Sequence, residues 1–296
     1  MNEMNGIIIV NPFLVPKESF YQAQRLKEEF NALGVNIEIV SDAFLRTQLL
    51  NGKITSKIIG ADFAVYLDKD KYQSEILSKL GLRLFNSHYA VRLCDDKAET
   101  YIALSSSNLR LPKTIFGALC YRNDLNPSIE WAENIGKQLG FPVIIKESFG
   151  SMGKGVHKAD DVNQLVEIME QVKLKPHIFQ EYIGAVKGVD VRVIVIGGKA
   201  VASMERRNAN DFRSNVAQGA QGKIIDLPES FKNTAEKCAR VLRLDYCGVD
   251  LLYDSDGQPV VCEVNSNAFI GGIEQVTGVN VAKLYAEYIF KTIYQS

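Results

Sequence analysis

Two groups of residues, far apart in the chain, have side chains and spacing that suit phosphate and metal chemistry. The first is a glycine-rich loop at 150–155, which follows an expected strand ending in Lys146 and Glu147. Three glycines in six residues allow backbone N–H groups to approach a phosphate closely and allow the loop to move. The loop is not a Walker A motif, because Gly155 rather than Ser or Thr follows Lys154. The alternative for this loop alone is a flexible hairpin tip.

The second group consists of Asp250, Glu263 and Asn265, in a hairpin expected near the end of the chain. Glu263 and Asn265 are two residues apart in a strand and therefore lie on one face. A connecting loop of even length would place Asp250 diagonally across from Glu263 on that face, whereas an odd loop without a bulge would not. Three oxygen donors, completed by water and substrate phosphates, suit Mg²⁺. The alternative is a solvated sheet face that carries carboxylates by chance, although unpaired carboxylates are costly to bury in such apolar strands.

The elements that must position these groups begin with a small open α/β domain in the first 90 residues. Short apolar runs predict its strands at 6–10, 35–40 and 62–67. A helix over 20–33, capped by Ser19 and ended by Gly34, joins the first two strands, and a helical stretch precedes the third. No G-x-G-x-x-G motif follows the first strand, so dinucleotide binding is not expected there.

A second, smaller α/β unit is expected from about 105 to 180, and the last third reads as an α+β lobe. The elements expected between the domains and in the second unit are helices over 95–104, 127–139 and 161–172, an extended segment over 111–116, and strands over 141–146 and 178–183. In the last third, Gly197-Gly198 supplies the positive φ angles of a two-residue hairpin. The largely antiparallel sheet is predicted from hairpins 189–196 with 199–205 and 247–253 with 258–264, covered by helices over 228–242 and 280–294.

The length and composition are those of an ordinary globular protein of about two domains. Of 296 residues, 34 are Lys or Arg and 35 are Asp or Glu, which argues against a basic nucleic-acid platform and an acidic tail. No apolar run approaches the roughly 18 residues of a transmembrane helix, and the first ten residues do not resemble a signal peptide, so a cytoplasmic location is expected. The five cysteines form no C-x-x-C pair and the three histidines have no metal-site spacing, which argues against a zinc site and a disulfide framework.

Eight short motifs occur in the order found in the ATP-grasp ligases. They are Asp95-Asp96-Lys97-Ala98-Glu99-Thr100, the Lys146 strand with its glycine-rich loop, Phe179-Gln180-Glu181-Tyr182-Ile183, Lys187-Gly188-Val189-Asp190-Val191-Arg192, Glu205-Arg206-Arg207, Asp211-Phe212-Arg213-Ser214-Asn215, Gly248-Val249-Asp250 and Glu263-Val264-Asn265-Ser266. Within that superfamily the chain resembles the RimK-type α-L-glutamate ligases and the related amino-carrier-protein ligases. The match covers nearly the whole chain, and the stretch from Glu205 to Asn215 is its most diagnostic part.

The resemblance implies an ATP-grasp fold of mixed α/β and α+β class, preceded by an N-terminal open α/β domain known as the pre-ATP-grasp domain. The implied divisions are this domain at 1–90, a central ATP-grasp subdomain with the glycine-rich loop at 91–180, and a C-terminal ATP-grasp lobe with the metal site at 181–296. ATP would be held between the central subdomain and the C-terminal lobe.

The resemblance also implies roles for individual residues in ATP binding. Lys97 and Lys146 would neutralise the phosphates as compact point charges. The backbone of a hinge segment would read the adenine edge, and Asp190 would hydrogen-bond the ribose. The hinge segment consists of Glu181, Tyr182 and Ile183. The mobile loop that closes over the reaction would include Gly150, Ser151 and Gly153.

Asp250, Glu263 and Asn265 match the metal ligands of the family, which implies two Mg²⁺ ions, with Mn²⁺ able to substitute. The candidates for holding the acceptor carboxylate and the developing oxyanion are Arg213, Asn215 and Arg206, because a guanidinium can bind a carboxylate or phosphate in two-pronged fashion. Replacement of Asp250 by Asn is expected to nearly abolish turnover and to leave the fold intact, since it changes no packing volume.

The implied activity is ATP- and Mg²⁺-dependent carboxylate–amine ligation through an acyl phosphate. Glutamate is the expected amine, and the acceptor is a small-molecule or a peptide or protein carboxylate. No side-chain nucleophile is required, which agrees with the absence of Ser-His-Asp and Cys-His arrangements. The alternatives are another ATP-grasp chemistry, such as a D-alanine:D-alanine-type ligase or a small-molecule kinase, and a nucleotide-binding module without turnover. Neither a nucleic acid nor a membrane is expected as a partner, and the resemblance suggests a homo-oligomer.

Two details depend on the local structure. If Gly197-Gly198 forms a two-residue loop, Asp190 faces Glu205 across the hairpin with Arg192 beside them, so that Arg192 is either a functional residue or only a structural ion-pair partner. The segment 267–272 departs from the small residue, Pro and Gly that many relatives have after Ser266. It should border the acceptor pocket, and Phe269 there either alters the substrate or is a neutral loop variant.

Overall fold

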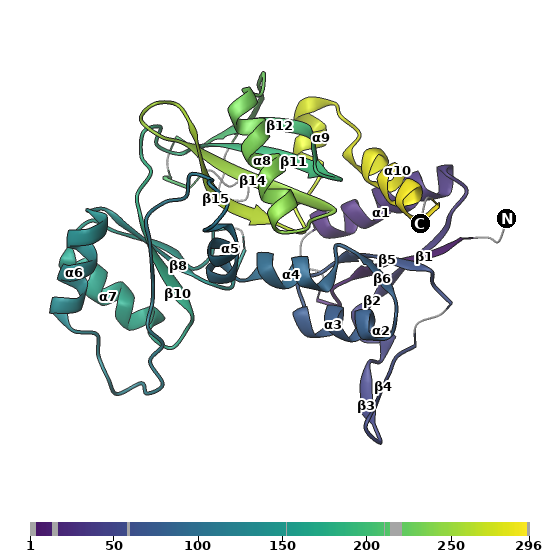
Figure 1. The fold of residues 1–296 in the computed structure, drawn as a ribbon, viewed down its shortest axis with the longest axis horizontal. Helices are drawn as coiled ribbons and strands as arrows, with labels where there is room; N and C mark the ends of the chain where they lie inside the picture. Colours follow the sequence, from purple (N-terminus) through teal and green to yellow (C-terminus); the bar gives the residue numbers. More distant parts are fainter. Residues whose placement is uncertain are drawn as a thin grey trace.

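The computed structural model describes residues 4–13, 17–57, 60–151, 153–209, 211–213 and 221–294. Among these residues, two four-stranded sheets, one five-stranded sheet and a two-stranded hairpin are formed. The three larger sheets follow one another along the long axis of the molecule, with the C-terminal sheet between the other two (Figure 1). Along the sequence, the chain therefore forms the sheet at one end first, then the sheet at the other end, and last the sheet in the middle.

The N-terminal sheet is parallel, as expected, and its strand order is β2-β1-β5-β6. Its elements are β1 (Asn5–Val10), α1 (Lys17–Ala32), β2 (Asn36–Ser41), α2 (Asp42–Leu45), β5 (Phe63–Leu67), α3 (Lys71–Lys79) and β6 (Arg83–Phe85). In β1, Ile8 and Val10 pack in the cluster beneath α1, whereas Ile7 and Ile9 pack in the cluster that contains residues of α2 and α3. Burial of both faces explains why this strand is a continuous apolar run rather than an alternating one.

Two expectations for this domain were wrong. Helix α1 begins at Lys17, so Ser19 lies inside the helix and is not its N-cap. The helical stretch expected before β5 is reduced to the four residues of α2, followed by a hairpin of β3 (Gln48–Leu50) and β4 (Lys53–Thr55). Asn51 and Gly52 form its turn with φ of 49° and 75°, which is the Asn-Gly signal of a tight hairpin.

Two helices, α4 (His88–Asp95) and α5 (Lys97–Leu104), connect the N-terminal sheet to the rest of the chain. The expected helix over 95–104 is α5, and Asp96 separates it from α4. Asp96 has extended backbone angles (φ −102°, ψ 112°), and its side chain accepts hydrogen bonds from the N–H groups of Ala98 and Glu99. This N-cap makes Lys97 the first residue of α5 and fixes the direction in which its side chain leaves the helix.

The central sheet has the order β7-β10-β8-β9, and every pair in it is antiparallel rather than of βαβ type. Its elements are β7 (Thr114–Phe116), α6 (Ile129–Leu139), β8 (Val143–Glu147), β9 (Val156–Ala159), α7 (Val162–Val172) and β10 (His177–Glu181). Val143, Ile145 and Phe179 pack against α6 and α7 on one face. The alternate residues, among them Ile144 and Lys146, therefore point to the opposite face, away from the helices.

The C-terminal sheet is antiparallel, as expected, and its strand order is β13-β12-β11-β14-β15. Its elements are β11 (Val189–Ile196), β12 (Lys199–Arg207), β13 (Gln221–Ile224), α8 (Glu229–Val241), β14 (Tyr246–Tyr253), β15 (Pro259–Asn265), α9 (Gly271–Thr277) and α10 (Val281–Tyr294). Odd-numbered residues of β11 and β14, such as Val193 and Val249, pack with α8. The even-numbered face changes along β11 from Asp190 and Arg192 to the apolar Ile194, which packs with α9 and α10.

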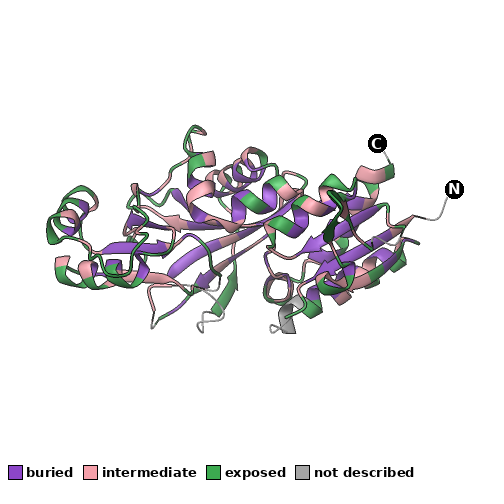
Figure 2. Ribbon diagram, turned by 90° about the horizontal axis from the view of Figure 1, so that it is seen from below, coloured by how far each residue is buried: buried purple, intermediate pink, exposed green. Residues whose placement is uncertain are grey.

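The N-terminal sheet and the C-terminal lobe share one hydrophobic core. Ala23 and Leu26 of α1 belong to the same buried cluster as Ala286 and Ile289 of α10. Figure 2 shows the buried strands continuing through the interior, with exposed residues on the outer helical surfaces. Within the described ranges, no helix is both long and apolar enough to cross a membrane.

Candidate active site

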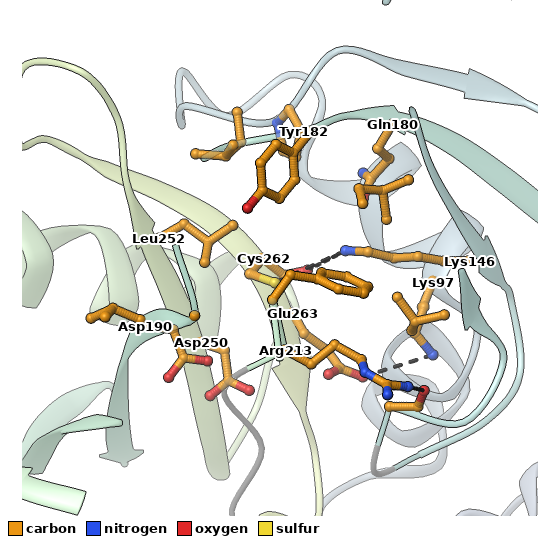
Figure 3. Close-up of a pocket in the computed structure, with 18 of the residues that line it drawn as sticks. Lys97, Lys146, Gln180, Tyr182, Asp190, Arg213, Asp250, Leu252, Cys262 and Glu263 are labelled. Atoms are coloured by element: carbon orange, nitrogen blue, oxygen red, sulfur yellow. Dashed lines mark hydrogen bonds and ion pairs between the residues drawn. The ribbon is translucent and has the colours of Figure 1, made fainter. Parts of the chain in front are cut away.

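A pocket lies between the free face of the central sheet and the C-terminal sheet, under the glycine-rich loop (Figure 3). Central residues that line it include Lys97, Ile144, Lys146, Gly150, Ser151, Gly153, Gln180, Glu181, Tyr182 and Ile183. C-terminal residues that line it include Asp190, Phe212, Arg213, Asp250, Leu252, Cys262 and Glu263. Residues selected from separate sequence motifs thus meet in one place.

Lys97 and Lys146 enter the pocket from the central side and reach the strand that carries Glu263. The Lys97 Nζ lies 3.8 Å from Glu263 Oε1 and donates to the Gly150 carbonyl at 3.0 Å. The Lys146 Nζ donates to the Cys262 carbonyl at 3.3 Å. Both lysines are 9% exposed, and two buried cations at one end of a pocket form a site for an anion.

The two lysines differ in their electrostatic surroundings. Burial lowers the pKa of Lys97, and Glu263 only partly opposes this effect. For Lys146, burial also acts to lower the pKa, but the neighbouring Cys262, Tyr101 and Glu263 outweigh it, so the net pKa lies above the ordinary value. Phosphate oxygens would add negative charge beside both ammonium groups and stabilise their protonated forms.

The glycine-rich loop connects β8 to β9, so it is a hairpin loop that also covers the pocket. Gly150, Gly153 and Gly155 have φ of 138°, 73° and 73°, a region that side chains rarely adopt. A Cβ on Gly155 would come within 3.0 Å of the Glu147 side chain. The loop therefore needs glycine for its conformation.

The hinge segment begins at the last residue of β10 and lies at the other end of the pocket from Lys97. The Glu181 carboxylate accepts from the Lys113 N–H at 2.8 Å and lies 3.6 Å from its Nζ. This contact ties the Glu181 side chain to the segment before β7. This arrangement is compatible with the expectation from the sequence, in which the backbone of the hinge segment, and not the Glu181 carboxylate, contacts the adenine.

Asp250 and Glu263 lie directly opposite each other on β14 and β15, because an irregularity restores their register. The pairing of Tyr253 with Pro259 leaves residues 254–258 as an odd loop, which alone would place Asp250 opposite Cys262. A bulge after Asp250 moves the partner to Glu263. Asp250 and Glu263 therefore share one face of the sheet, as predicted. They do so because an odd loop is combined with a bulge and the two residues pair directly, whereas the prediction assumed an even loop and a diagonal pairing.

The carboxylate of Asp250 is buried and held by two guanidinium groups. Arg192 binds it with two hydrogen bonds, Nε to Oδ1 at 2.7 Å and Nη2 to Oδ2 at 2.6 Å, and Arg206 Nη2 lies 2.9 Å from Oδ2. Burial acts to raise the pKa of Asp250, but the two arginines outweigh it and hold the pKa below its ordinary value. Asp250 is thus an anion with a fixed orientation.

Arg206 does not have the role expected from the sequence. Its side chain is 2% exposed, and its guanidinium binds Asp190 as well as Asp250. It therefore has no surface on which to hold an acceptor carboxylate. The expected pairing of Asp190 with Glu205 was also wrong, because a bulge between Ile194 and Val195 shifts the register and places Asp190 opposite Arg206. Arg192 is an ion-pair partner, but of Asp250.

Arg213 remains a candidate for a role in the reaction, because it lies in the pocket beside the glycine-rich loop. Its Nη1 donates to the Gly153 carbonyl at 3.1 Å, and Asp211 binds the other side of the guanidinium. The hydrogen bond to Asp211 raises the pKa of Arg213, so the group stays charged. Asn215, the other residue expected here, lies outside the described residues.

Asp250, Glu263 and Asn265 offer two carboxylates and one amide, the kinds of oxygen donor that Mg²⁺ takes in proteins. Asn265 pairs with Gly248 and lies two residues from Glu263 on the same strand, though it is not among the described residues that line the pocket. In the described part of the chain, no group of three or more His, Cys, Asp or Glu side chains could by itself hold a metal ion. A set of two carboxylates and one amide would leave the other coordination positions of a magnesium ion to phosphates and water.

Several residues of the pocket were not selected from the sequence. Ile144 and Leu252 give it apolar walls, and Cys262 and Gln180 complete its lining. Strand alternation could have found the first two, since Ile144 is two residues from Lys146 and Leu252 two from Asp250. The departing segment after Ser266 leads into α9 with Ala268 and Ile270 in the shared core, and the role of Phe269 stays a prediction.

Comparison with known proteins gives matches over most of the chain. The RimK-like ATP-grasp domain family matches residues 94–289. Beta-citrylglutamate synthase B of Danio rerio is 33% identical over 232 residues, 77% of this chain, and the match spans 56% of that protein, so the chain covers only about half its length. The probable alpha-L-glutamate ligase of Psychromonas ingrahamii is 31% identical, with 93% of each chain covered. Among solved structures, D-alanine–D-alanine ligase from Bacillus anthracis in complex with ATP aligns with a TM-score of 0.75 at 21% identity, over 99% of this chain and 98% of the other.

Proposed function

The chain belongs to the RimK-like ATP-grasp family of carboxylate–amine ligases, and we propose that it adds an amino acid to a carboxylate acceptor through an acyl phosphate. The observation that supports this most directly is that Lys97 and Lys146 face the Asp250–Glu263 pair across one pocket. A site with cations on one wall and carboxylates on the other suits a metal-bound triphosphate. ATP is the nucleotide of this family.

In this proposal the base of ATP lies between the apolar Ile144 and Leu252, against the backbone of the hinge segment. Asp190 accepts from the ribose, and the triphosphate extends toward Lys146, Lys97 and the glycine-rich loop. Arg213 binds the γ-phosphate or the acceptor carboxylate, because its guanidinium lies against that loop. Asn215, close to Arg213 in sequence, is proposed to act with it.

Asp250, Glu263 and Asn265 are the proposed metal ligands, for two Mg²⁺ ions that Mn²⁺ can replace. Bound there, the metal supplies positive charge to the β- and γ-phosphates. The acceptor carboxylate oxygen attacks the γ-phosphorus, and ADP leaves. The amine nitrogen then attacks the acyl carbon, phosphate leaves, and the nitrogen loses a proton. Closure of the glycine-rich loop keeps water from the acyl phosphate between these two steps.

Glutamate is the first amine to test, because the relatives that match over 93% of their length are named alpha-L-glutamate ligases. The acceptor could be a small molecule or the end of a peptide or protein, and a homo-oligomer is proposed from the resemblance. A screen of acid and amine pairs for ADP release, with amide products identified by mass spectrometry, tests the ligation directly. D-Alanine belongs in the panel because of the likeness in fold to D-alanine–D-alanine ligase.

Hydroxylamine separates the remaining alternatives. A ligase in the presence of ATP and its acceptor alone yields a hydroxamate, whereas a kinase that phosphorylates a hydroxyl yields none. Nucleotide binding without ADP release across the whole panel would favour a module without turnover and would contradict the proposal. The Lys146→Met variant is the matched control in these assays. It removes a positive charge that faces the proposed phosphates and keeps an unbranched apolar side chain.

A further inference from the structure

Beneath the pocket, one buried guanidinium connects the two carboxylates that the proposed function assigns to the ribose and to the metal. The Arg206 Nε lies 2.7 Å from Asp190 Oδ1, and its Nη2 contacts both Asp190 Oδ2 and, at 2.9 Å, Asp250 Oδ2. Asp190 and Asp250 line the pocket, and Arg206 lies behind them at 2% exposure. No ligand would touch Arg206, yet it touches both candidate ligand-binding carboxylates.

The strand register makes this bridge possible. Asp190 is paired with Arg206 between β11 and β12, and Arg192 is paired with Asp250 between β11 and β14. Four charges of alternating sign thus lie on one face of three adjacent strands. Each carboxylate meets the guanidinium of its register partner in a two-pronged contact, and the Arg206 Nη2 joins the two pairs.

Sharing of one nitrogen makes the two carboxylates interdependent. The N–H groups of Arg206 Nη2 are divided between Asp190 and Asp250, and in a buried setting such charge-assisted bonds are strong. An Asp250 carboxylate that holds a cation has less electron density left for Arg206. The guanidinium then binds Asp190 more closely, which changes how Asp190 can accept from a ribose hydroxyl.

We propose that Arg206 is a positioning residue that couples recognition of the ribose by Asp190 to binding of the metal by Asp250. The inference rests on the proposed function, in that it assumes a nucleotide in this pocket with its ribose at Asp190. It goes further by proposing that ribose recognition and metal binding are thermodynamically linked through a residue that contacts neither ligand.

Binding measurements on the full chain test the linkage without any acceptor or amine. The affinities of ADP and 2′,3′-dideoxy-ADP are measured by calorimetry, first with EDTA and then with Mg²⁺. In the wild type the ratio of the two affinities is expected to change by about fivefold or more on addition of Mg²⁺, the lower end of typical coupling between sites. A ratio that is the same with and without Mg²⁺ overturns the proposal.

The Arg206→Lys variant identifies the residue that carries the linkage. Lysine keeps the charge but is a point donor that cannot divide a planar fork between two carboxylates, so the ratio is expected to become independent of Mg²⁺. The matched control is Arg192→Lys, which changes the other guanidinium on Asp250 and leaves the Arg206 bridge in place; its ratio should still respond to Mg²⁺. An unchanged response in Arg206→Lys overturns the proposal.

Two further observations keep the result interpretable. A thermal melt of each variant checks that it is folded, and Arg206→Gln, which keeps amide donors without the charge, replaces Arg206→Lys if the latter does not fold, with the same expectation. Failure of the ligation screen together with Mg²⁺-dependent ribose recognition would refute the proposed activity alone. Ligation without any linkage in the wild type would refute the inference alone.

Discussion

Replacement of the two proposed metal-ligand carboxylates, one at a time, should separate metal binding from folding. Asp250→Asn and Glu263→Gln each remove one negative charge and change almost no volume. Asp250 is 2% exposed and bound by Arg192 and Arg206. The Glu263 side chain is 29% exposed, and its ion pair with Lys97 spans 3.8 Å. We therefore expect Asp250→Asn to remain folded but to be less stable than the wild type.

The magnitudes follow from burial. Removal of one partner from a buried ion pair costs about 3–5 kcal/mol, because the other charge is left uncompensated. In Asp250→Asn, Arg206 would keep its contact with Asp190, whereas Arg192 would lose the carboxylate that it binds. For a chain of this size a loss of 1 kcal/mol lowers Tm by roughly 2 °C, so Asp250→Asn should melt about 6–10 °C lower. A partly exposed pair is worth about 1 kcal/mol or less, so Glu263→Gln should melt within about 2 °C of the wild type.

Thermal melts and ADP-release assays on the same preparations provide the measurement. Both variants should lose about 100-fold or more of kcat with saturating substrates, because each loses a charge at the phosphates. Measured at 15 °C, where both are folded, the two losses should be similar although the melting temperatures differ. Equal melting temperatures for the two variants would refute the reasoning about the buried pairs, and wild-type turnover in Glu263→Gln would refute the metal assignment.

Three further changes test other parts of the structure. Arg213→Lys should raise the KM for ATP about tenfold in steady-state assays, because it loses the planar fork beside the glycine-rich loop; an unchanged KM would remove Arg213 from the nucleotide site. Burial and the neighbouring Asp68 raise the pKa of Asp42 to about 8. The folded state therefore keeps a proton that the unfolded chain releases near pH 4, and the stability of the wild type falls as the pH rises from about 4 to about 8. Asp42→Asn should therefore melt higher than the wild type at pH 8 and much like it at pH 4, and the reverse order in melts across this range would contradict the shift. Gly188→Ala should cost about 2–4 kcal/mol by denaturant unfolding, because φ is +68° and a Cβ would come within 2.2 Å of a backbone oxygen. Its control, Gly257→Ala, has φ of +73° but open space and should cost about 1 kcal/mol; equal losses would show that the close approach does not matter.

The sequence predicted the elements whose patterns are local. Apolar runs marked β1, β2 and β5, and Gly197-Gly198 marked the turn between β11 and β12. The elements that were missed also had local sequence signals, but the prediction gave these signals less weight than the helical pattern around them. Asn51-Gly52 is a hairpin signal inside a stretch taken as helical, and the helix expected from residue 95 begins at Lys97, after its N-cap Asp96. These errors moved element boundaries but did not affect the order of the sheets.

Sequence motifs identified the functional residues. The motifs could not show which of these side chains form ion pairs with one another. Arg206 looks like an available guanidinium in the sequence because nothing local marks it as buried. Its burial follows from a partner sixteen residues away on β11 and another on β14. Such partners depend on register, and register depends on bulges that any residue type can form.

The two bulges of the C-terminal sheet show how strongly this site depends on register. Without the bulge at Ile194 and Val195, Asp190 would face Glu205, and two carboxylates would lie together with no guanidinium between them. Without the bulge after Asp250, the odd loop at 254–258 would turn Glu263 to the face covered by α8, where it would displace an apolar residue such as Val264. Both irregularities therefore act in the same sense. Each bulge shifts one strand by a single residue, which is the smallest shift that exchanges the two faces of a strand. Together the two bulges place the acidic residues on the pocket face, beside the arginines that bind them.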